Sequence, residues 1–456
     1  MDRPSSRRQF LRRSFGAAAG AFLAACTKGA ERILPKQSSP SPSIDPVLGL
    51  DTRWPIKRVV YLMLENRSFD NVFGAFPGAN GATKGIKDGK EVPLTRCPAW
   101  LPEDLPHNYD YAIECLAGGK MDGFAAEYSR SSVAFAYSQL AREDVPNYWH
   151  WAENYVLSDN FFASALGPSY ANHLFYIAGD SAGTFDAPVN ARLVDLPEGG
   201  KSKSWGCDTP ENVYVLVKDK NGKTHRSRPC FNLESVGDQL LERDISWRYY
   251  APEPNQVGYI WSAYTSIKSI YHDQEVWDSH IQPVDRVIQD VKAGDLPSVT
   301  WIVPRYELSD HPPWSSTNAH NWVTEIVNGI MEGPMWENTA IFITWDEWGG
   351  FYDHVRPPAV DRVGLGFRVP MLVLSPYAKR GYIDRKLGEF STPLRFIQDN
   401  WGMPHNTERI RRTHNFAHAF DFKRNPRPPD PKPVKKVAGN AFKHPGRYPG
   451  WPPEFR

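Results

Sequence analysis

The stretch VVYLMLENRSFD, residues 59–70, passes without a break from six apolar residues to a polar run. A short, continuous apolar segment is typical of a strand buried on both faces of a parallel sheet. Glu65 and Asn66 follow this segment directly. In open α/β sheets, ligands bind beyond the carboxyl ends of the strands. A carboxylate and an amide at this point therefore predict a functional edge of the sheet.

Further apolar runs repeat this pattern along the chain. We expect strands at residues 58–64, 246–251, 298–304, 339–345 and 369–375. Amphipathic stretches predict helices at residues 145–157, 169–179, 234–244, 319–333 and 391–402. Strands that alternate with helices form parallel sheets covered on both faces. The sequence thus predicts one large α/β domain over residues 55–422, built around a mainly parallel sheet.

Residues 180–232 fit this alternation poorly. They contain the polar stretch VYVLVKDKNGKTHR, residues 213–226, in which Asn-Gly is a strong signal for a hairpin turn. We expect this region to be a small antiparallel insertion over one edge of the sheet.

The first 26 residues carry targeting signals. SRRQFLR, residues 6–12, is a twin-arginine motif, and the Ala-rich stretch after it is too short to span a bilayer. LAAC, residues 23–26, resembles a bacterial lipobox, in which Cys26 becomes lipidated. Ordinary cleavage near Ala25 is the alternative. Both readings predict a protein exported in the folded state by the twin-arginine machinery. With the lipid, it would be a membrane-anchored protein of the periplasm or cell surface.

The segments that flank the predicted domain are low in apolar periodicity. Residues 27–54 are rich in Ser and Pro, as expected of a flexible tether. Residues 423–456 form a tail rich in Pro and Lys, for which we predict no secondary structure.

The formal net charge is only +1, so charge does not point to nucleic acid as the main partner.

Five cysteines allow a disulfide framework if the chain is exported. With Cys26 lipidated, four remain and three connectivities are possible. We favour the sequence-local pairs Cys97 with Cys115 and Cys207 with Cys230. None of them has the spacing of a zinc cluster.

A second strand end repeats the pattern of the first. In TAIFITWDEWGG, residues 339–350, the apolar run is followed by Asp346 and Glu347. The two glycines at the end of this stretch permit a tight turn. Together with Glu65 and Asn66, these residues offer only oxygen ligands. Such a set suits a hard divalent cation, Ca²⁺, Mg²⁺ or Mn²⁺ before zinc. The alternative is that these side chains cap helices or simply interact with water on loops.

Ser169 follows a Gly-Pro turn at the start of a predicted helix. Backbone N–H groups and the positive end of the helix dipole make such a position an anion site. Serine is also a common helix N-cap, and the chain has no Gly-x-Ser-x-Gly elbow. A nucleophilic role would therefore require activation by a cation. Loop histidines that could carry protons, or could simply be solvated, are His107, His311 and His354.

These segments together resemble a bacterial phosphoesterase family that contains phosphatidylcholine-type phospholipases C and a branch of periplasmic acid phosphatases. The resemblance covers about residues 55–405 and rests on MLENRSFDNVFGAFPG (63–78), LPHNYD (105–110), NYVLSDNFFASALGPSYANHLFYIAG (154–179), SDHPP (309–313) and WENTAIFITWDEWGGFYDHVRPP (336–358). It implies a three-layer α/β/α fold like that of alkaline phosphatase. Phospholipases of the family usually carry threonine at the position of Ser169, and serine is similar to the acid phosphatase branch.

Position by position, the resemblance implies a role for each candidate. The metal ligands would be Glu65, Asn66, Asp346 and Glu347, the nucleophile would be Ser169, and the phosphate pocket would be lined by His107, His311 and His354, with Asn66 and His107 binding substrate. The implied activity is metal-dependent hydrolysis of a phosphoric ester through a phosphoseryl intermediate. The substrate would be a phospholipid or a phosphomonoester. The alternatives are an acid phosphatase of broad monoester specificity and a non-catalytic surface lipoprotein that binds phosphorylated ligands.

Overall fold

A computed structural model describes residues 45–125, 131–191, 194–195 and 201–436 of the chain. The expected signal peptide with Cys26 and residues 27–44 of the expected tether lie outside this described part.

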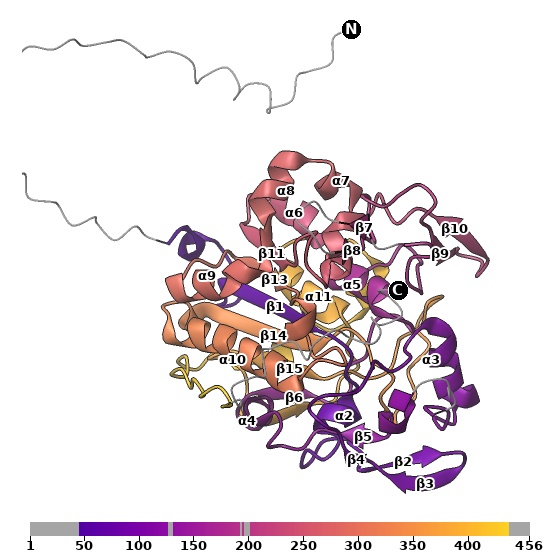
Figure 1. The fold of residues 1–456 in the computed structure, drawn as a ribbon. Coiled ribbons are helices and arrows are strands. Elements are labelled where there is room, and N and C mark those ends of the chain that lie inside the picture. Colours follow the sequence, from indigo (N-terminus) through magenta and orange to yellow (C-terminus); the bar gives the residue numbers. More distant parts are fainter. Residues whose placement is uncertain (1–44, 126–130, 192–193, 196–200, 437–456) are drawn as a thin grey trace, which may run out of the picture. The chain divides into compact units, whose positions relative to one another are not determined.

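The central feature is an eight-stranded sheet (Figure 1). Its strands, in spatial order, are β12 (Ile281–Pro283), β11 (Trp247–Ala251), β13 (Val299–Ile302), β1 (Arg58–Leu64), β14 (Thr339–Trp345), β15 (Met371–Leu374), β6 (Val156–Ser158) and β16 (Tyr382–Asp384). β15 runs antiparallel to both of its neighbours, and every other pair is parallel. The predicted, mainly parallel sheet is therefore confirmed.

Helices cover both faces of this sheet. Phe342 of β14 packs on Phe396 of α11 (Ser391–Asn400), with 5.4 Å between the ring centres. Trp345 lies three residues further along the same strand and packs on Tyr148 of α4 (Pro146–Asn154) at 5.4 Å. Because side chains alternate between the faces of a strand, these two helices lie on opposite faces. The three-layer α/β/α arrangement is confirmed.

The other elements connect and extend these layers. The remaining helices are α2 (Phe69–Phe73), α3 (Tyr109–Leu116), α5 (Ser169–Ala178), α6 (Val236–Glu242), α7 (Lys268–Tyr271), α8 (Gln274–His280), α9 (Val287–Ala293), α10 (Ser316–Glu332) and α12 (Glu408–Arg412). The remaining strands are β2 (Lys84–Lys87), β3 (Lys90–Pro93), β4 (Thr95–Arg96), β5 (Ser138–Gln139), β7 (Val194–Asp195), β8 (Lys201–Ser202), β9 (Val215–Lys218) and β10 (Thr224–Ser227).

All five expected strands form, but the helix expected over residues 145–157 is too long. α4 ends at Asn154, and β6 begins two residues later. β6 is only three residues long and pairs with both β15 and β16. A strand this short leaves too few residues for its period to stand out from the preceding helix. β12 and β16 were missed for the same reason.

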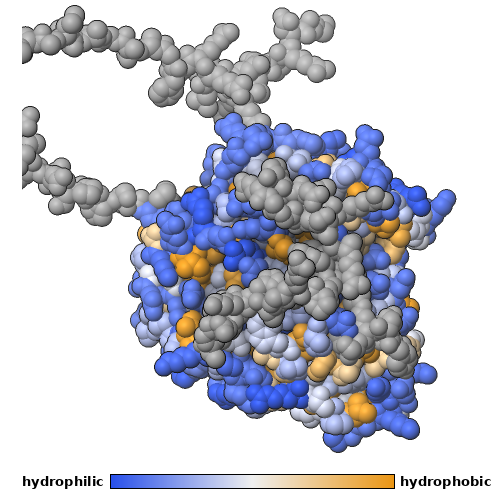
Figure 2. Space-filling model, viewed as in Figure 1, coloured by the Kyte–Doolittle hydropathy of each residue, from blue (hydrophilic) through white to orange (hydrophobic). Residues whose placement is uncertain are grey.

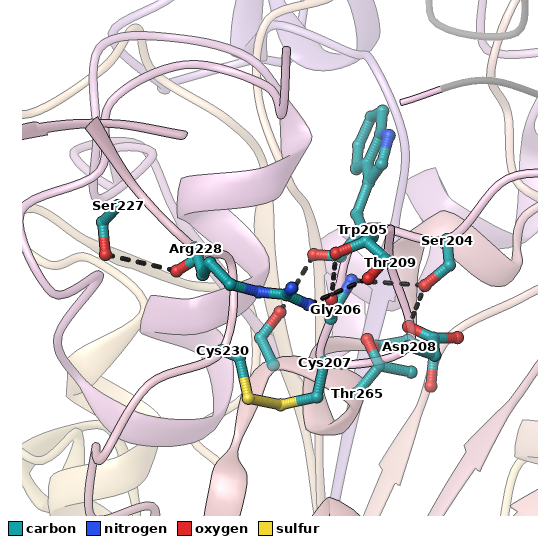
Figure 3. Close-up of a disulfide and its surroundings, with 12 residues drawn as sticks. Ser204, Trp205, Gly206, Cys207, Asp208, Thr209, Ser227, Arg228, Cys230 and Thr265 are labelled. Carbon is teal, nitrogen blue, oxygen red and sulfur yellow. Dashed lines mark hydrogen bonds between the residues drawn. A yellow bond between two sulfur atoms is a disulfide. The ribbon is translucent and has the colours of Figure 1, made fainter. Parts of the chain in front are cut away.

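The region of residues 180–232 contains two antiparallel pairs, β7 with β8 and β9 with β10. The predicted turn joins β9 to β10, with Gly222 at φ +77°. The predicted disulfide between Cys207 and Cys230 is present (Figure 3). Beside it, the Cys207 amide donates a 2.7 Å hydrogen bond to the carbonyl of Thr265, which ties the insertion to the body of the domain.

The expected disulfide between Cys97 and Cys115 is wrong, because both residues are buried free thiols. Cys97 follows β4 and has its Sγ 3.8 Å from a guanidinium nitrogen of Arg67. Cys115 lies on the buried face of α3 beside Tyr111, and burial raises the pKa of its thiol. Proximity in sequence suggested a pair, but the backbone directs the two side chains into different surroundings.

Both flanking segments contact the domain where the structure describes them. Trp54, in the expected tether, stacks on Phe396 at 4.6 Å and on Phe422 at 5.4 Å. In the expected tail, the backbone of Lys432 and Lys435 exchanges hydrogen bonds with asparagine side chains of α10. Residues 45–54 thus belong to the folded body. Residues 421–436 contain no helix or strand, yet they are held by these contacts.

The visible face of the molecule is largely hydrophilic, with small apolar areas between polar ones (Figure 2). Within the described ranges, none of the helices combines the length and the apolar character needed to cross a bilayer.

We predict that the two free thiols can be counted directly. In a Cys26→Ser variant, the denatured but unreduced chain should react with two equivalents of a thiol reagent, because only Cys97 and Cys115 remain unpaired. Reduction should raise the number to four. A count of zero before reduction would show that the two cysteines form the disulfide.

Candidate active site

The pairing of β1 with β14 brings the two polar strand ends together. The strands are parallel and in register, with Leu64 opposite Trp345, so the residues that follow them become neighbours. The Asp346 amide donates to the carbonyl of Leu64 at 2.9 Å. The backbone amide of Asn66 in turn donates to Asp346 Oδ1 at 2.9 Å. Asn66 itself has a φ of +61°, which turns the chain sharply at the end of β1.

Two glycines after the second strand allow three segments to meet. A Cβ atom on Gly349 would lie 2.5 Å from the carbonyl oxygen of Asn66. A Cβ atom on Gly350 would lie 2.6 Å from the carbonyl oxygen of Pro106. Both glycines also have positive φ angles, of +62° and +79°. The predicted tight turn is therefore required for the loop that carries His107 to lie against the strand ends.

Ser169 is the first residue of α5, and its hydroxyl group faces the strand ends. Ser169 Oγ donates to Glu65 Oε2 at 3.2 Å, and the side chain is only 3% exposed. The N-cap of α5 is Pro168, without a side-chain hydrogen bond to the helix amides. The alternative that Ser169 serves as an N-cap is therefore wrong, and its hydroxyl belongs to the polar cluster.

Sequence reasoning missed His173 in this cluster. Its Nε2 lies 2.8 Å from Glu65 Oε1 and 4.0 Å from Asp346 Oδ2, and the ring is 2% exposed. Burial lowers the pKa of His173 to about 4, against the opposing effect of Asp346. The available signal was the spacing from Ser169, because residues four apart lie on one face of a helix.

The oxygen atoms of this cluster suit a divalent cation. Within the described part of the chain, the buried side-chain oxygen and nitrogen of Asn66 and the Oδ2 atom of Asp346 have no hydrogen-bond partner. Burial, followed by the charges of Asp346 and Glu347, raises the pKa of Glu65 well above its usual value. Crowded, buried carboxylates repel one another, and a bound cation removes that repulsion. The predicted ligands Glu65, Asn66 and Asp346 thus fit a metal ion as a group.

Glu347 is fully buried and lies close enough to affect Glu65 electrostatically. Its Oε2 atom accepts a 2.7 Å hydrogen bond from the Gly349 amide. One of its oxygens is therefore used to hold the turn that follows β14.

Two of the three predicted histidines lie together, and one of them, His107, lines a cavity with Ser169. The rings of His107 and His311 are 5.5 Å apart. Asp104 lies between them, with its oxygens 3.4 Å from His107 Nδ1 and 3.8 Å from His311 Nδ1. His107, Asp104 and Ser169 line one cavity of about 280 Å³, to which the insertion contributes Lys203. The cavity therefore places a serine hydroxyl group, a histidine and a lysine around one small volume.

The third histidine, His354, belongs to a different cluster. Its Nδ1 lies 2.6 Å from Asp70 Oδ2, and its backbone amide donates to the same oxygen at 2.9 Å. Arg368 is fully buried and pairs with both Asp70 and Asp353. His354 contacts Asp70, Arg368 and Asn80, none of which belongs to the cluster around Glu65. These contacts suggest that His354 braces the loop after β14.

The sequence profile of the phosphoesterase family matches residues 56–404. The chain belongs to the phosphoesterase family. The hemolytic phospholipase C of Pseudomonas aeruginosa is 26% identical over 83% of this chain and 57% of that protein. Phospholipase C B of Mycobacterium tuberculosis is 25% identical over 88% of this chain and 82% of that protein. The resemblance in the five sequence stretches is thus confirmed, and it agrees with the predicted ester-bond hydrolase.

This member of the phosphoesterase family spans less than two thirds of the length of the Pseudomonas protein. Among solved structures, a protein of the alkaline phosphatase superfamily from Vibrio parahaemolyticus matches with a TM-score of 0.35 and 10% identity, over 82% of this chain and 74% of that one. This TM-score is too low to support a conclusion about the chain. The assignment of the fold depends on the strand order of the central sheet.

We predict that His354 stabilises the fold most strongly at low pH. Burial alone would lower its pKa, but the hydrogen bond to Asp70 and the charges of Asp70 and Asp353 together outweigh burial and raise it. A raised pKa contributes stability that is complete below the usual histidine pKa and is lost as the pH rises through the folded-state value. His354→Gln should therefore cost about 1–3 kcal/mol in urea unfolding at pH 5.5 and less at pH 9.

His280→Gln is the matched control for this measurement. Burial lowers the pKa of His280, so its contribution to stability changes with pH in the opposite direction. An equal loss of stability at both pH values in His354→Gln would contradict the charged pair with Asp70.

Proposed function

We propose that this chain is an exported, metal-dependent phosphoric ester hydrolase whose nucleophile is Ser169. The observation that carries the proposal is the 3.2 Å contact of Ser169 Oγ with Glu65, at the wall of a cavity that also contains His107. The twin-arginine motif and Cys26 support export and a lipid anchor in the periplasm or at the cell surface. The membrane and the twin-arginine machinery would then be partners of the chain.

The substrate phosphate is an anion that repels a nucleophile, so its charge must be neutralised. A divalent cation held by Glu65, Asn66, Asp346 and Glu347 would supply that neutralisation and would favour the ionised form of the Ser169 hydroxyl. Ca²⁺, Mg²⁺ and Mn²⁺ suit this donor set better than Zn²⁺. The N-terminal end of α5 adds a favourable dipole at the same point.

Ser169 Oγ then attacks phosphorus, the ester oxygen departs with its alcohol, and a phosphoseryl intermediate forms. Water attacks the same phosphorus atom in the second step and releases phosphate or a phosphomonoester. Each step replaces one P–O bond with another, so no redox partner is required. The side-chain amide of Asn66 is buried at the end of β1 and can donate a hydrogen bond to a phosphate oxygen.

The departing alkoxide needs a proton, for which His107 and His311 are the proposed sources. His107 Nδ1 contacts the carbonyl of Leu105 at 2.8 Å, and His311 Nδ1 contacts that of Pro312 at 2.5 Å. These contacts keep a proton on Nδ1. The ring that acts as the general acid would carry a second proton on Nε2 and would donate it to the departing oxygen. His354 contacts Asp70 instead and receives no part in this mechanism.

The substrate is a phospholipid or a phosphomonoester. The two relatives named above are called phospholipases C, which supports a lipid phosphodiester. The alternative is an acid phosphatase of broad monoester specificity. It is supported by the serine at position 169, since serine at this position is similar to the acid phosphatase branch of the family. A non-catalytic lipoprotein that binds phosphorylated ligands would need the end of α5 but neither a nucleophile nor a cation.

We expect Ser169→Ala to fold normally and to lose turnover by roughly 10³-fold or more, because no nucleophile remains. Hydrolysis of a chromogenic phosphomonoester measures the loss, and acid quenching with radiolabelled substrate detects phosphoserine in the wild type alone. Ser391→Ala is the matched control, since Ser391 is also a buried serine at the first position of a helix. Wild-type turnover in Ser169→Ala would overturn the covalent mechanism.

Chelation followed by reconstitution tests the cation and the substrate together. We expect the chelated wild type to lose hydrolysis and to regain it with Mn²⁺, Mg²⁺ or Ca²⁺. The reconstituted protein should be assayed in parallel on a phosphomonoester, phosphatidylcholine and a choline-free phospholipid. Hydrolysis that survives chelation would contradict metal dependence. Binding of phosphate without hydrolysis of any of the three would favour the non-catalytic alternative.

A further inference from the structure

The two polar residues that α5 presents to the cluster hold opposite ends of one carboxylate. Ser169 contacts Glu65 Oε2 at 3.2 Å, and His173, one helical turn later, contacts Oε1 at 2.8 Å. Glu65 follows β1 and is fully buried, so its orientation is set by these neighbours. The helix therefore fixes the orientation of the carboxylate as well as supplying the hydroxyl group.

The contacts of the His173 ring indicate a donor more than a metal ligand. A histidine that binds metal through one nitrogen almost always donates its other N–H to a carboxylate, a carbonyl or water. Here Nδ1 is buried and has no partner among the residues that the structure covers. Buried acceptors without a partner are tolerated better than buried N–H donors without one. The ring proton therefore belongs on Nε2, where it is donated to Glu65 Oε1.

We propose that His173 is a positioning residue that holds Glu65 with Oε2 directed at Ser169 and at the cation. This inference rests on the cation of the proposed function. Nothing in the sequence patterns or in the comparisons assigns a role to this histidine. A neighbour that orients a metal ligand typically changes metal affinity by 10- to 100-fold when it is removed.

The test is Mn²⁺ binding to the full chain, measured by electron paramagnetic resonance, in the wild type, His173→Gln and His173→Leu. His173→Leu should bind Mn²⁺ about 10- to 100-fold more weakly, because Glu65 loses its donor. His173→Gln keeps an N–H donor of similar reach and should recover part of the affinity. At saturating Mn²⁺, we expect kcat of the Gln variant to return close to that of the wild type.

His320→Leu is the matched control, since His320 is a buried helical histidine that accepts the Asn147 amide at 3.0 Å. It should lose stability without a change in Mn²⁺ affinity. Unchanged Mn²⁺ affinity in His173→Leu, with the wild type binding normally, would overturn the inference alone. A kcat that stays low at saturating Mn²⁺ in the Gln variant would also overturn it, in favour of a direct catalytic role. Failure of the wild type to bind Mn²⁺ would remove the proposed function together with the inference.

Discussion

The parallel pairing of β1 with β14 determines the site. Its register places Glu65 and Asn66 beside Asp346 and Glu347, at the edge of the sheet where both strands end. All four side chains are buried, and three of them are carboxylates. Water cannot relieve the repulsion between buried charges of the same sign, so the arrangement is stable only with protons or with a cation. Burial, followed by the charges of Asp346 and Glu347, accordingly raises the pKa of Glu65.

Other segments are arranged around this pair of strand ends. α5 directs Ser169 and His173 at the two oxygens of one carboxylate. The loop that carries His107 lies against the Gly350 turn because that position has no side chain. Each of these contacts joins segments that are distant in sequence. The proposed nucleophile, the proposed cation ligands and the proposed proton carriers therefore depend on packing that no single segment could produce alone.

The buried group of Asp70, Asp353 and Arg368 differs from the group around Glu65 in its charge balance. It contains two carboxylates but also a fully buried guanidinium, so its charge is compensated within the protein. His354 completes it by its contact with Asp70. The contrast between the two groups supports different roles. The group around Arg368 holds loops together, whereas the crowded carboxylates around Glu65 suit a bound cation.

The sequence by itself determined five of the eight strands of the central sheet, the positions of Glu65, Asn66, Asp346, Glu347 and Ser169 at strand and helix ends, and the family. Long apolar strands and polar strand ends are local patterns, which can be read without knowing the fold. Only the tertiary structure decided that His173 joins the cluster, that His354 leaves it, and that Cys97 and Cys115 stay unpaired. These outcomes depend on which side chains meet once distant segments pack together. The spacing of His173 from Ser169 places both on one face of α5, but it does not tell what that face contacts.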